Sequence, residues 1–151
     1  MPRQMLQEQE PVGLLVAAAR RSLKQAVLRH ARPLRLTPPQ FWFVNAAQEM
    51  PDASLGELAR RLRMDPPTAS RLAEGLSRRG VLKVTADTRD RRVTRVSLTP
   101  SGLKLAQRIA PIAKAVRSAG TQNMSERELS ALRASLRKFV HNLESFAGSA
   151  T

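Results

Sequence analysis

The chain has 151 residues and no cysteine, and its 26 lysines and arginines against 12 aspartates and glutamates give a formal charge of +14. The length suits one domain with a hydrophobic core, and the lack of cysteine excludes disulfides, thiolate metal sites and cysteine-based redox sensing. The charge predicts a nucleic-acid partner, although a codon usage that favours arginine would also produce it. No apolar run approaches the roughly 20 residues of a membrane span, and the first ten residues lack the order of a signal peptide. We therefore expect a cytoplasmic protein without membrane contact.

Helical periodicity dominates the N-terminal part of the chain. Apolar residues such as Leu15, Leu23 and Val27 recur at helical spacing and predict a long amphipathic helix over 12–30, which Pro33 ends. Thr37 followed by two prolines is typical of a helix N-cap and predicts a short second helix that stops near Pro51.

Two further helices follow in close succession. Ser54 and Glu57 form a capping-box pattern that opens a third helix, and Asp65 before two prolines predicts a fourth over 66–79. Two helices joined by about three residues have the spacing of a helix-turn-helix. The outward face of the fourth helix carries side chains suited to DNA bases and phosphates: Pro67, Ser70, Arg71, Glu74 and Arg78.

The sequence period changes from 3.6 to 2 after Gly80, so residues 81–85 and 93–98 predict a two-stranded hairpin. A hairpin directly behind a helix-turn-helix is a wing, whose basic tip could enter the minor groove. Turn formation requires none of the three arginines in the connecting segment, Arg89, Arg91 and Arg92. Four apolar side chains of the strands should face the core: Leu82, Val84, Val96 and Leu98.

The C-terminal third predicts two long helices. Thr99-Pro-Ser-Gly caps a fifth helix that runs to about Ser118, and a capping box at Ser125 and Glu128 opens the last one. The apolar stripe of the last helix is either a coiled-coil-like face or the buried side of an ordinary amphipathic helix. Long helices at both ends of the chain favour a two-fold dimer. The stripe consists of Leu129, Leu132, Leu136, Phe139, Leu143 and Phe146.

Five segments resemble the MarR family of bacterial winged-helix regulators: 36–41, 55–62, 70–82, 87–92 and 98–102. The specific combination is an Asp-x-Arg-Asp-Arg-Arg wing followed within a dozen residues by Leu-Thr-x-x-Gly, since a helix-turn-helix alone occurs in many folds. The resemblance implies a mainly α fold with a small β-hairpin wing, in which a winged helix-turn-helix is flanked by N- and C-terminal dimerisation helices.

The same resemblance implies a single MarR-like domain over 1–151, with dimerisation helices in 12–35 and 100–147 and a winged lobe over 37–98. A homodimer would then bind double-stranded DNA at a pseudo-palindromic operator. Residues implied to contact DNA are Pro67, Thr68, Ser70, Arg71, Glu74 and Arg78 on the fourth helix, and Arg89 and Arg91 on the wing.

The acidic residues of the wing require a separate explanation. Unpaired carboxylates there would repel phosphate, so we expect Asp87 and Asp90 to pair with neighbouring arginines and shape the loop. Simple turn formation is an equally good explanation. Arg92 is predicted to be structural for the same reason.

The family resemblance also implies an effector, a small aromatic acid or phenol that relieves repression. Trp42 lies off the apolar stripe of the second helix and could line a cavity, or pack on the first helix or on a partner subunit. A carboxylate would need a donor on the first helix. The predicted ligand-binding residues are Arg20, His30, Phe41 and Trp42.

Other functional classes have little support in the sequence. Two histidines without cysteine make a poor metal site, so we expect no metal or cofactor, and DNA binding that survives chelation. No nucleophile motif or phosphate-cradling glycine loop indicates an enzyme. The alternative is an effector-independent architectural protein that coats DNA, and the choice between repressor and activator depends on operator position, which the protein sequence does not encode.

Overall fold

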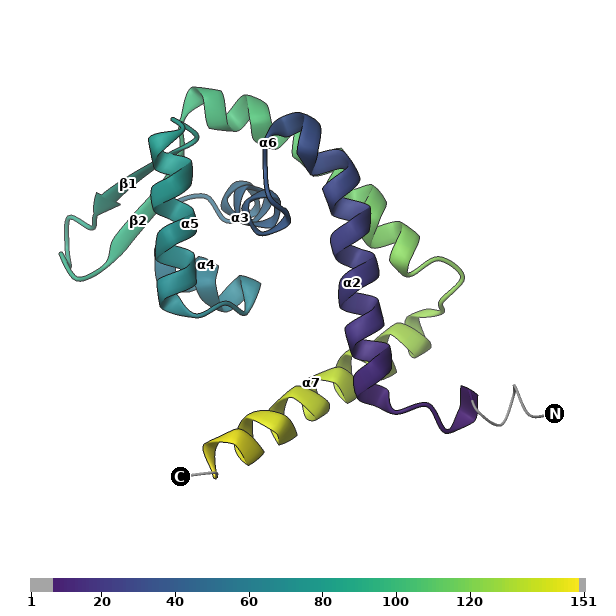
Figure 1. The fold of residues 1–151 in the computed structure, drawn as a ribbon. Helices are drawn as coiled ribbons and strands as arrows, with labels where there is room; N and C mark the ends of the chain where they lie inside the picture. The colour runs from purple at the N-terminus through teal and green to yellow at the C-terminus, as the bar shows by residue number, and fades with distance from the viewer. Residues whose placement is uncertain (1–6, 150–151) are drawn as a thin grey trace. The chain divides into compact units, whose positions relative to one another are not determined.

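The computed structural model describes residues 7–149, and the chain divides into two compact units, 1–116 and 117–151. The first six residues, which bear on the expectation about a signal peptide, lie outside the described residues. Within the described part, no helix is long and apolar enough to cross a membrane. The N-terminal unit contains α2 (Val12–Ala31), the 3-10 helix η1 (Arg32–Leu34), α3 (Pro38–Glu49), α4 (Leu55–Leu62), α5 (Pro66–Arg78), β1 (Leu82–Ala86) and β2 (Thr94–Leu98), shown in Figure 1. Helix α6 (Pro100–Gly120) starts in this unit and ends in the second, which contains α7 (Glu126–Gly148).

Helix starts are set by local side-chain hydrogen bonds, as the sequence predicts. Thr37, Ser54, Asp65 and Ser125 each accept the backbone N–H of the residue three positions later, at 2.8 to 3.3 Å. At three of these four starts the side chain of that later residue accepts the N–H of the cap in return. These bonds satisfy donors that the first helical turn leaves without an intrahelical partner.

The hydrophobic core of the N-terminal unit surrounds α3, which contacts α2, α4, α5 and β2. Phe41 and Phe43 on α3 have no exposed surface, and Asn45 is buried with its amide donating to Glu49 at 3.0 Å. A helix that is buried over most of its surface needs apolar residues on most of its faces, so its apolar residues form no narrow stripe. The largest fully buried side chains are Phe41, Phe43, Leu58, Leu76, Ile109, Val27, Val44 and Val96.

The apolar stripe of α2 is buried only near its C-terminus. Val27 and Ala31 are completely buried, whereas Leu15 and Leu23 remain 50% and 49% exposed. The buried residues of α2 all lie in its last turns, next to η1, which leads directly into α3. The earlier turns present an apolar face without cover from the described chain.

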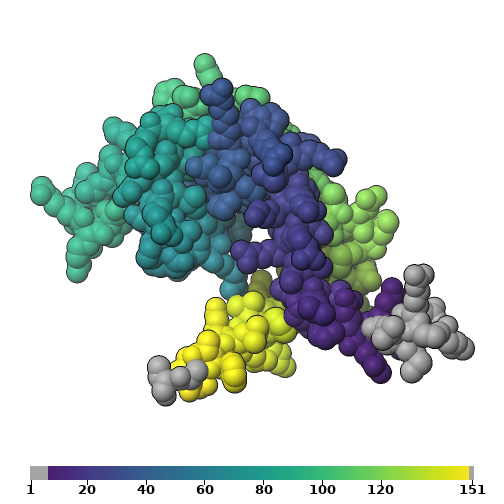
Figure 2. Space-filling view, viewed as in Figure 1, coloured from purple at the N-terminus to yellow at the C-terminus, as the bar shows by residue number. Residues whose placement is uncertain are grey.

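The hairpin has the predicted antiparallel pairing, with Leu82 opposite Leu98 and Val84 opposite Val96. These four side chains share one face, but Val84 is 37% exposed, so the prediction that all four face the core is wrong at that position. The hairpin projects from the body of the N-terminal unit, as its teal-green atoms show in Figure 2. Its strand β2 packs against α3 and α4, which buries Val96 and leaves the opposite Val84 partly exposed.

The junction between hairpin and α6 is held by Thr99 and Gly102. The Thr99 hydroxyl lies within hydrogen-bond distance of the carbonyls of Gly80 and Val81 and accepts the N–H of Gly102 at 3.0 Å. A Cβ on Gly102 would lie 2.0 Å from the Val81 oxygen. Glycine is therefore required for the start of α6 to approach the turn after α5 this closely, which gives the Leu-Thr-x-x-Gly pattern a physical basis.

Helix α7 in the second unit has no buried residue. Its apolar stripe is exposed at Leu132, Leu136, Leu143 and Phe146, with 75% of Phe146 accessible. A long helix with an uncovered apolar stripe gains little stability from the packing that normally supports helices in proteins. The stripe is therefore a candidate surface for association.

Candidate DNA interface

The turn between α4 and α5 has the predicted length of three residues, 63–65. Arg63 adopts a left-handed conformation with φ 51°, and the N–H of Met64 donates to the Ala59 carbonyl at 3.0 Å. This closure ends α4 in the manner of a helix C-cap, and Asp65 starts α5 immediately afterwards. Helices α4 and α5 thus form a helix-turn-helix.

Helix α5 is divided into a buried and an exposed face along the predicted line. Ala69, Ala73 and Leu76 are buried, which leaves the opposite side free to meet a partner. The Arg71 guanidinium lies 3.4 Å from the Thr68 hydroxyl, one helical turn earlier. The predicted contact residues lie on the accessible surface: Pro67, Arg71, Glu74 and Arg78 are exposed, and Thr68 and Ser70 are half-buried.

The N-terminus of α5 is occupied by its own cap. Asp65 accepts the Thr68 N–H at 2.8 Å, and this backbone hydrogen bond lowers the pKa of the Asp65 carboxyl below its usual range. A charged carboxylate at this position uses the positive end of the helix dipole. The Thr68 amide therefore already has an anionic partner within the chain.

The tip of the wing is organised by Asp90. The Val93 N–H donates to the Asp90 carbonyl at 2.9 Å, closing a four-residue turn, and the Asp90 carboxylate accepts the Arg92 N–H at 3.1 Å. Both carboxylate oxygens also accept from the Arg92 guanidinium, at 3.1 and 3.2 Å. This pairing lowers the pKa of the Asp90 carboxyl and matches the shaping role predicted for Asp90 and Arg92.

The two remaining tip arginines have no such partner. Arg89 and Arg91 are exposed, and within residues 7–149 neither side chain forms an ion pair or hydrogen bond. Because the turn is held by Asp90 and Arg92, the guanidinium groups beside it are displayed from an ordered loop. They are available to an anionic partner.

The junction between the wing loop and its strands contains a contact that sequence reasoning missed. Asp87 pairs with Arg95 across the hairpin, with the Arg95 Nε 3.4 Å from the carboxylate. An arginine partner for Asp87 is expected from the sequence, but its identity as Arg95, eight residues away, is not. Its place opposite Thr85 in the strand register was the available signal.

Arg79, at the end of α5, was also missed. Its guanidinium donates to the backbone carbonyls of Leu34 and Arg35, at the end of η1. This side chain connects the last turn of α5 to the segment after α2, over more than 40 residues of sequence. Nothing in the local pattern distinguishes it from Arg78, whose side chain forms no hydrogen bond or ion pair within the described residues.

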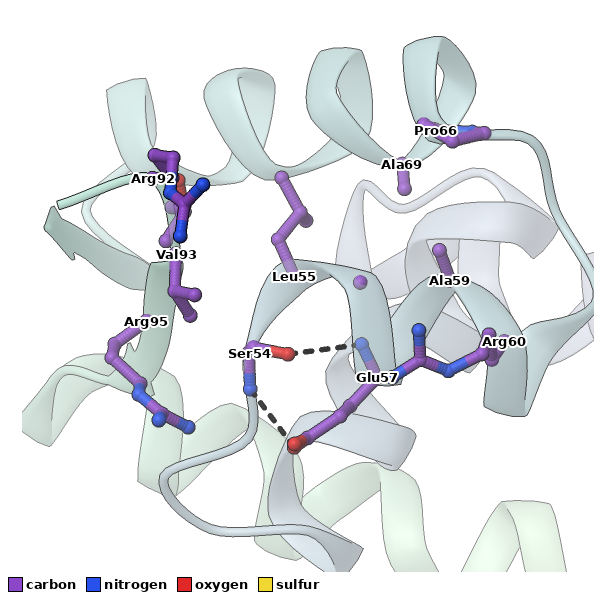
Figure 3. A pocket seen from close by; sticks show the side chains of 12 residues that line it. Ser54, Leu55, Glu57, Ala59, Arg60, Pro66, Ala69, Arg92, Val93 and Arg95 are labelled. Carbon is purple, nitrogen blue, oxygen red and sulfur yellow. Dashed lines mark hydrogen bonds between the residues drawn. The ribbon is translucent and has the colours of Figure 1, made fainter. Parts of the chain in front are cut away.

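A cavity of about 500 Å³ lies between α4, α5 and the wing (Figure 3). Leu55 points toward α5 in the centre of this cavity, while Arg92 and Arg95 come from the strand side. A second cavity of about 400 Å³ shares Leu55 and Thr94 with the first and extends along α5 to Ser77 and Arg78. The surface between α5 and the wing is therefore hollowed.

The predicted ligand residues have different environments. Arg20 and His30 are exposed on α2, Trp42 is half-buried, and Phe41 is fully buried. The rings of Phe41 and Trp42 meet edge to face, with centroids 5.2 Å apart. Phe41 is thus a core residue, and direct contact with an effector would require the core to open. Among the described residues, no group of three or more potential metal-ligating His, Cys, Asp or Glu side chains occurs.

Comparison with known families identifies the same segment. A model of the MarR family matches residues 36–93, which cover α3, the helix-turn-helix and the wing up to its second strand. Over its winged helix-turn-helix segment the chain matches the MarR family. It is a DNA-binding transcriptional regulator, and the MarR family and fold are those of transcription regulators rather than of enzymes.

Individual relatives agree with this assignment. The chain is 25% identical over 109 residues to the uncharacterized HTH-type transcriptional regulator YsmB of Bacillus subtilis, and the match covers 72% of this chain and 75% of YsmB. The structure of Bordetella bronchiseptica BpsR, whose DNA binding is regulated by 6-hydroxynicotinic acid, is 27% identical with a TM-score of 0.73, and the match covers 87% and 94% of the two chains. A MarR mutant from E. coli in complex with operator DNA has the same fold, at 21% identity and a TM-score of 0.71 over 89% and 96%.

Proposed function

We propose that this chain acts as a homodimeric repressor at a pseudo-palindromic operator, with α5 in the major groove and the wing in the adjacent minor groove. The observation that carries the proposal is the combination of an exposed polar face on α5 with an ordered wing, on which Arg89 and Arg91 have no partner within residues 7–149. A dimer of such lobes reads two half-sites whose centres are about one helical turn, roughly 34 Å, or a multiple apart. Cytoplasmic location remains part of the proposal, and cell fractionation tests it.

On α5 the proposed roles differ by side chain. Arg71 presents a guanidinium that fits the acceptors of guanine, and Glu74 suits the amino group of cytosine. Thr68, Ser70 and Arg78 supply hydroxyl and guanidinium donors for phosphates or base edges. Pro67 provides a compact apolar contact at the first turn. We assign Asp87, Asp90 and Arg92 to wing shape rather than to DNA.

Wing binding is tested by the salt dependence of operator affinity. Log affinity falls with log salt by about 0.9 for each phosphate contact, so Arg91→Ala should weaken binding and flatten this slope. Arg127→Ala, which removes an exposed arginine on α7, is the charge-matched control and should leave both unchanged. Equal affinity and slope in the Arg91 variant would refute the wing assignment. Arg71→Ala should instead relax base preference at its position by about 1 to 3 kcal/mol.

The dimer proposal rests on the uncovered apolar faces of α2 and α7. Leu15, Leu23 and Leu136 are each more than a third exposed, and a second copy of the chain is the partner that two-fold symmetry supplies most simply. Leu136→Glu should yield a monomer in sedimentation velocity and weaken operator binding. A Leu136→Glu protein that sediments like the wild type would favour packing of α7 within its own chain.

The effector proposal is a small aromatic acid or phenol that releases DNA. Support comes from BpsR, which responds to 6-hydroxynicotinic acid, and from the half-buried Trp42 with Arg20 and His30 exposed on α2. Ligand at 100 times its dissociation constant stabilises a protein by about 2.7 kcal/mol. A thermal-shift screen that includes 6-hydroxynicotinic acid, followed by operator release, therefore tests this part.

A footprint separates this regulator from the alternative of an architectural protein. A repressor should protect a discrete inverted repeat and lose that protection when an effector is added. Uniform protection along the fragment, unaffected by small molecules, would support DNA coating instead.

A further inference from the structure

Arg95 connects three segments of the winged lobe. Its Nε pairs with the Asp87 carboxylate at the end of the wing loop, at 3.4 Å, and its Nη1 donates to the Asp52 carbonyl at 3.1 Å. The backbone of Arg95 also forms a β-bridge with Ser54. In Figure 3 the Arg95 side chain extends from β2 toward the loop that leads into Ser54. One side chain thus joins both strands of the wing to the segment that starts α4.

The wing needs such an attachment. A two-stranded hairpin is marginally stable by itself, and this one projects from the body of the unit (Figure 2). Next to Arg95, the Val96 N–H donates to the Ala53 carbonyl at 3.1 Å, so the attachment at 52–54 combines backbone and side-chain bonds. The hairpin is fixed to the helix-turn-helix at this point.

The contact is partly shielded from solvent, which strengthens it. The Asp87 side chain is only 17% exposed and that of Arg95 40%, in contrast to 90% for Arg92 in the tip pair. Partial burial raises the electrostatic attraction between the charges. The planar fork of a guanidinium can serve a carboxylate and a carbonyl at once, whereas a lysine ammonium is a single compact charge.

We infer that Arg95 is a positioning residue, which sets the orientation of the wing relative to α5 so that Arg89 and Arg91 reach DNA. This inference rests on the proposed DNA contact of those two tip arginines. The Asp90–Arg92 pair cannot replace it, because both residues lie within the tip and order only the local turn.

The electrostatic effect of replacing Asp87 and the loss of its contact with Arg95 predict opposite changes in operator affinity. Asp87→Asn removes a negative charge from a DNA-binding surface, so simple electrostatics predicts tighter binding. Loss of the Arg95 contact predicts weaker binding, because the wing is no longer held. Arg95→Lys preserves the charge but not the fork, so it should bind operator nearly as weakly as Arg95→Ala. If Arg95 met a phosphate directly, lysine would restore most of the affinity.

The decisive experiment is a double-mutant cycle measured by operator titration at fixed salt. We expect Arg95→Ala to weaken binding about tenfold in the wild-type wing. In the Arg89→Ala, Arg91→Ala background the same change should have less than a twofold effect, because nothing at the tip remains to be positioned. Lys83→Ala, an exposed charge removal on β1, is the control and should show no such coupling. Circular dichroism melts accompany each variant.

The outcomes separate the inference from the proposal beneath it. Equal losses from Arg95→Ala in both backgrounds, tighter binding by Asp87→Asn, or full rescue by Arg95→Lys would each overturn the positioning role. If the Arg89→Ala, Arg91→Ala variant binds operator as tightly as the wild type, the proposed DNA contact of the wing is refuted. The positioning role of Arg95 is then refuted as well, because it depends on that contact. If Arg95→Ala does not fold, the direction of the affinity change in Asp87→Asn and Arg95→Lys decides between positioning and direct phosphate contact.

Discussion

Gly102 offers a sharp test of how the winged lobe is assembled. In Gly102→Ala the new Cβ would lie 2.0 Å from the Val81 oxygen and 3.0 Å from its carbonyl carbon. The start of α6 must then move by about 1 Å, which also weakens the Thr99 N–H bond to Val81, now 3.1 Å long. Overpacking typically costs about 1–3 kcal/mol, and a lost hydrogen bond about 1 kcal/mol.

The expected destabilisation is therefore about 3 kcal/mol, which for a chain of this size lowers the melting temperature by about 6–12 °C. Gly75→Ala is the matched control, because nothing lies within 4 Å of the added Cβ and Gly75 is inside a helix. Alanine there should raise stability by about 1 kcal/mol. Melting curves followed by circular dichroism measure both. A Gly102→Ala protein that melts within about 2 °C of the wild type would refute the packing account.

Three further predictions concern single side chains whose hydrogen bonds hold a helix or a turn in place. Arg79→Ala removes the bonds to the carbonyls that end η1 and should lower the melting temperature by about 2–4 °C. Arg78→Ala should leave the melting temperature unchanged, and equal melting of the two variants would contradict the link. The lowered pKa of Asp90 means that its charged form stabilises the fold above the unfolded pKa, and that this contribution is lost as pH falls through the folded pKa. The unfolding free energy should thus fall below about pH 4, and less steeply in Asp90→Asn; an equal or steeper fall in that variant would be inconsistent with the pairing. Ser125→Ala removes the cap of α7 and should cost about 1 kcal/mol, which would raise the dissociation constant of the proposed dimer about fivefold. Ser125→Asp keeps a capping oxygen and should leave that constant unchanged; sedimentation equilibrium compares the two.

Helix boundaries were predictable because their causes are local. The caps at Thr37, Ser54, Asp65 and Ser125 each act over three residues, so the pattern and the hydrogen bond occupy the same short segment. The tip turn at Asp90 is local in the same sense. These features follow from side-chain chemistry and spacing, before any tertiary contact forms.

Burial was predictable only in part. Leu15 and Val27 belong to one apolar stripe, yet only Val27 is covered, because cover depends on which turns of α2 lie near η1 and α3. Val84 lies opposite the buried Val96 and shares its face, but it is β2 that packs against α3 and α4. Phe41 is a core residue although its neighbour Trp42 remains half-buried. Periodicity identifies a face, while the neighbouring element decides whether that face is buried.

The sequence alone determined the order of elements, the helix starts, the residues on the outer face of α5 and the basic character of the wing, because each depends on contacts within a few residues or on composition. The tertiary structure decided the partners of Arg79 and Arg95. Arg79 reaches carbonyls 44 and 45 residues away, and Arg95 reaches one 43 residues away. Such bonds exist only after distant segments have packed together, and no local pattern separates Arg79 from the neighbouring Arg78, whose side chain forms no bond within the described residues.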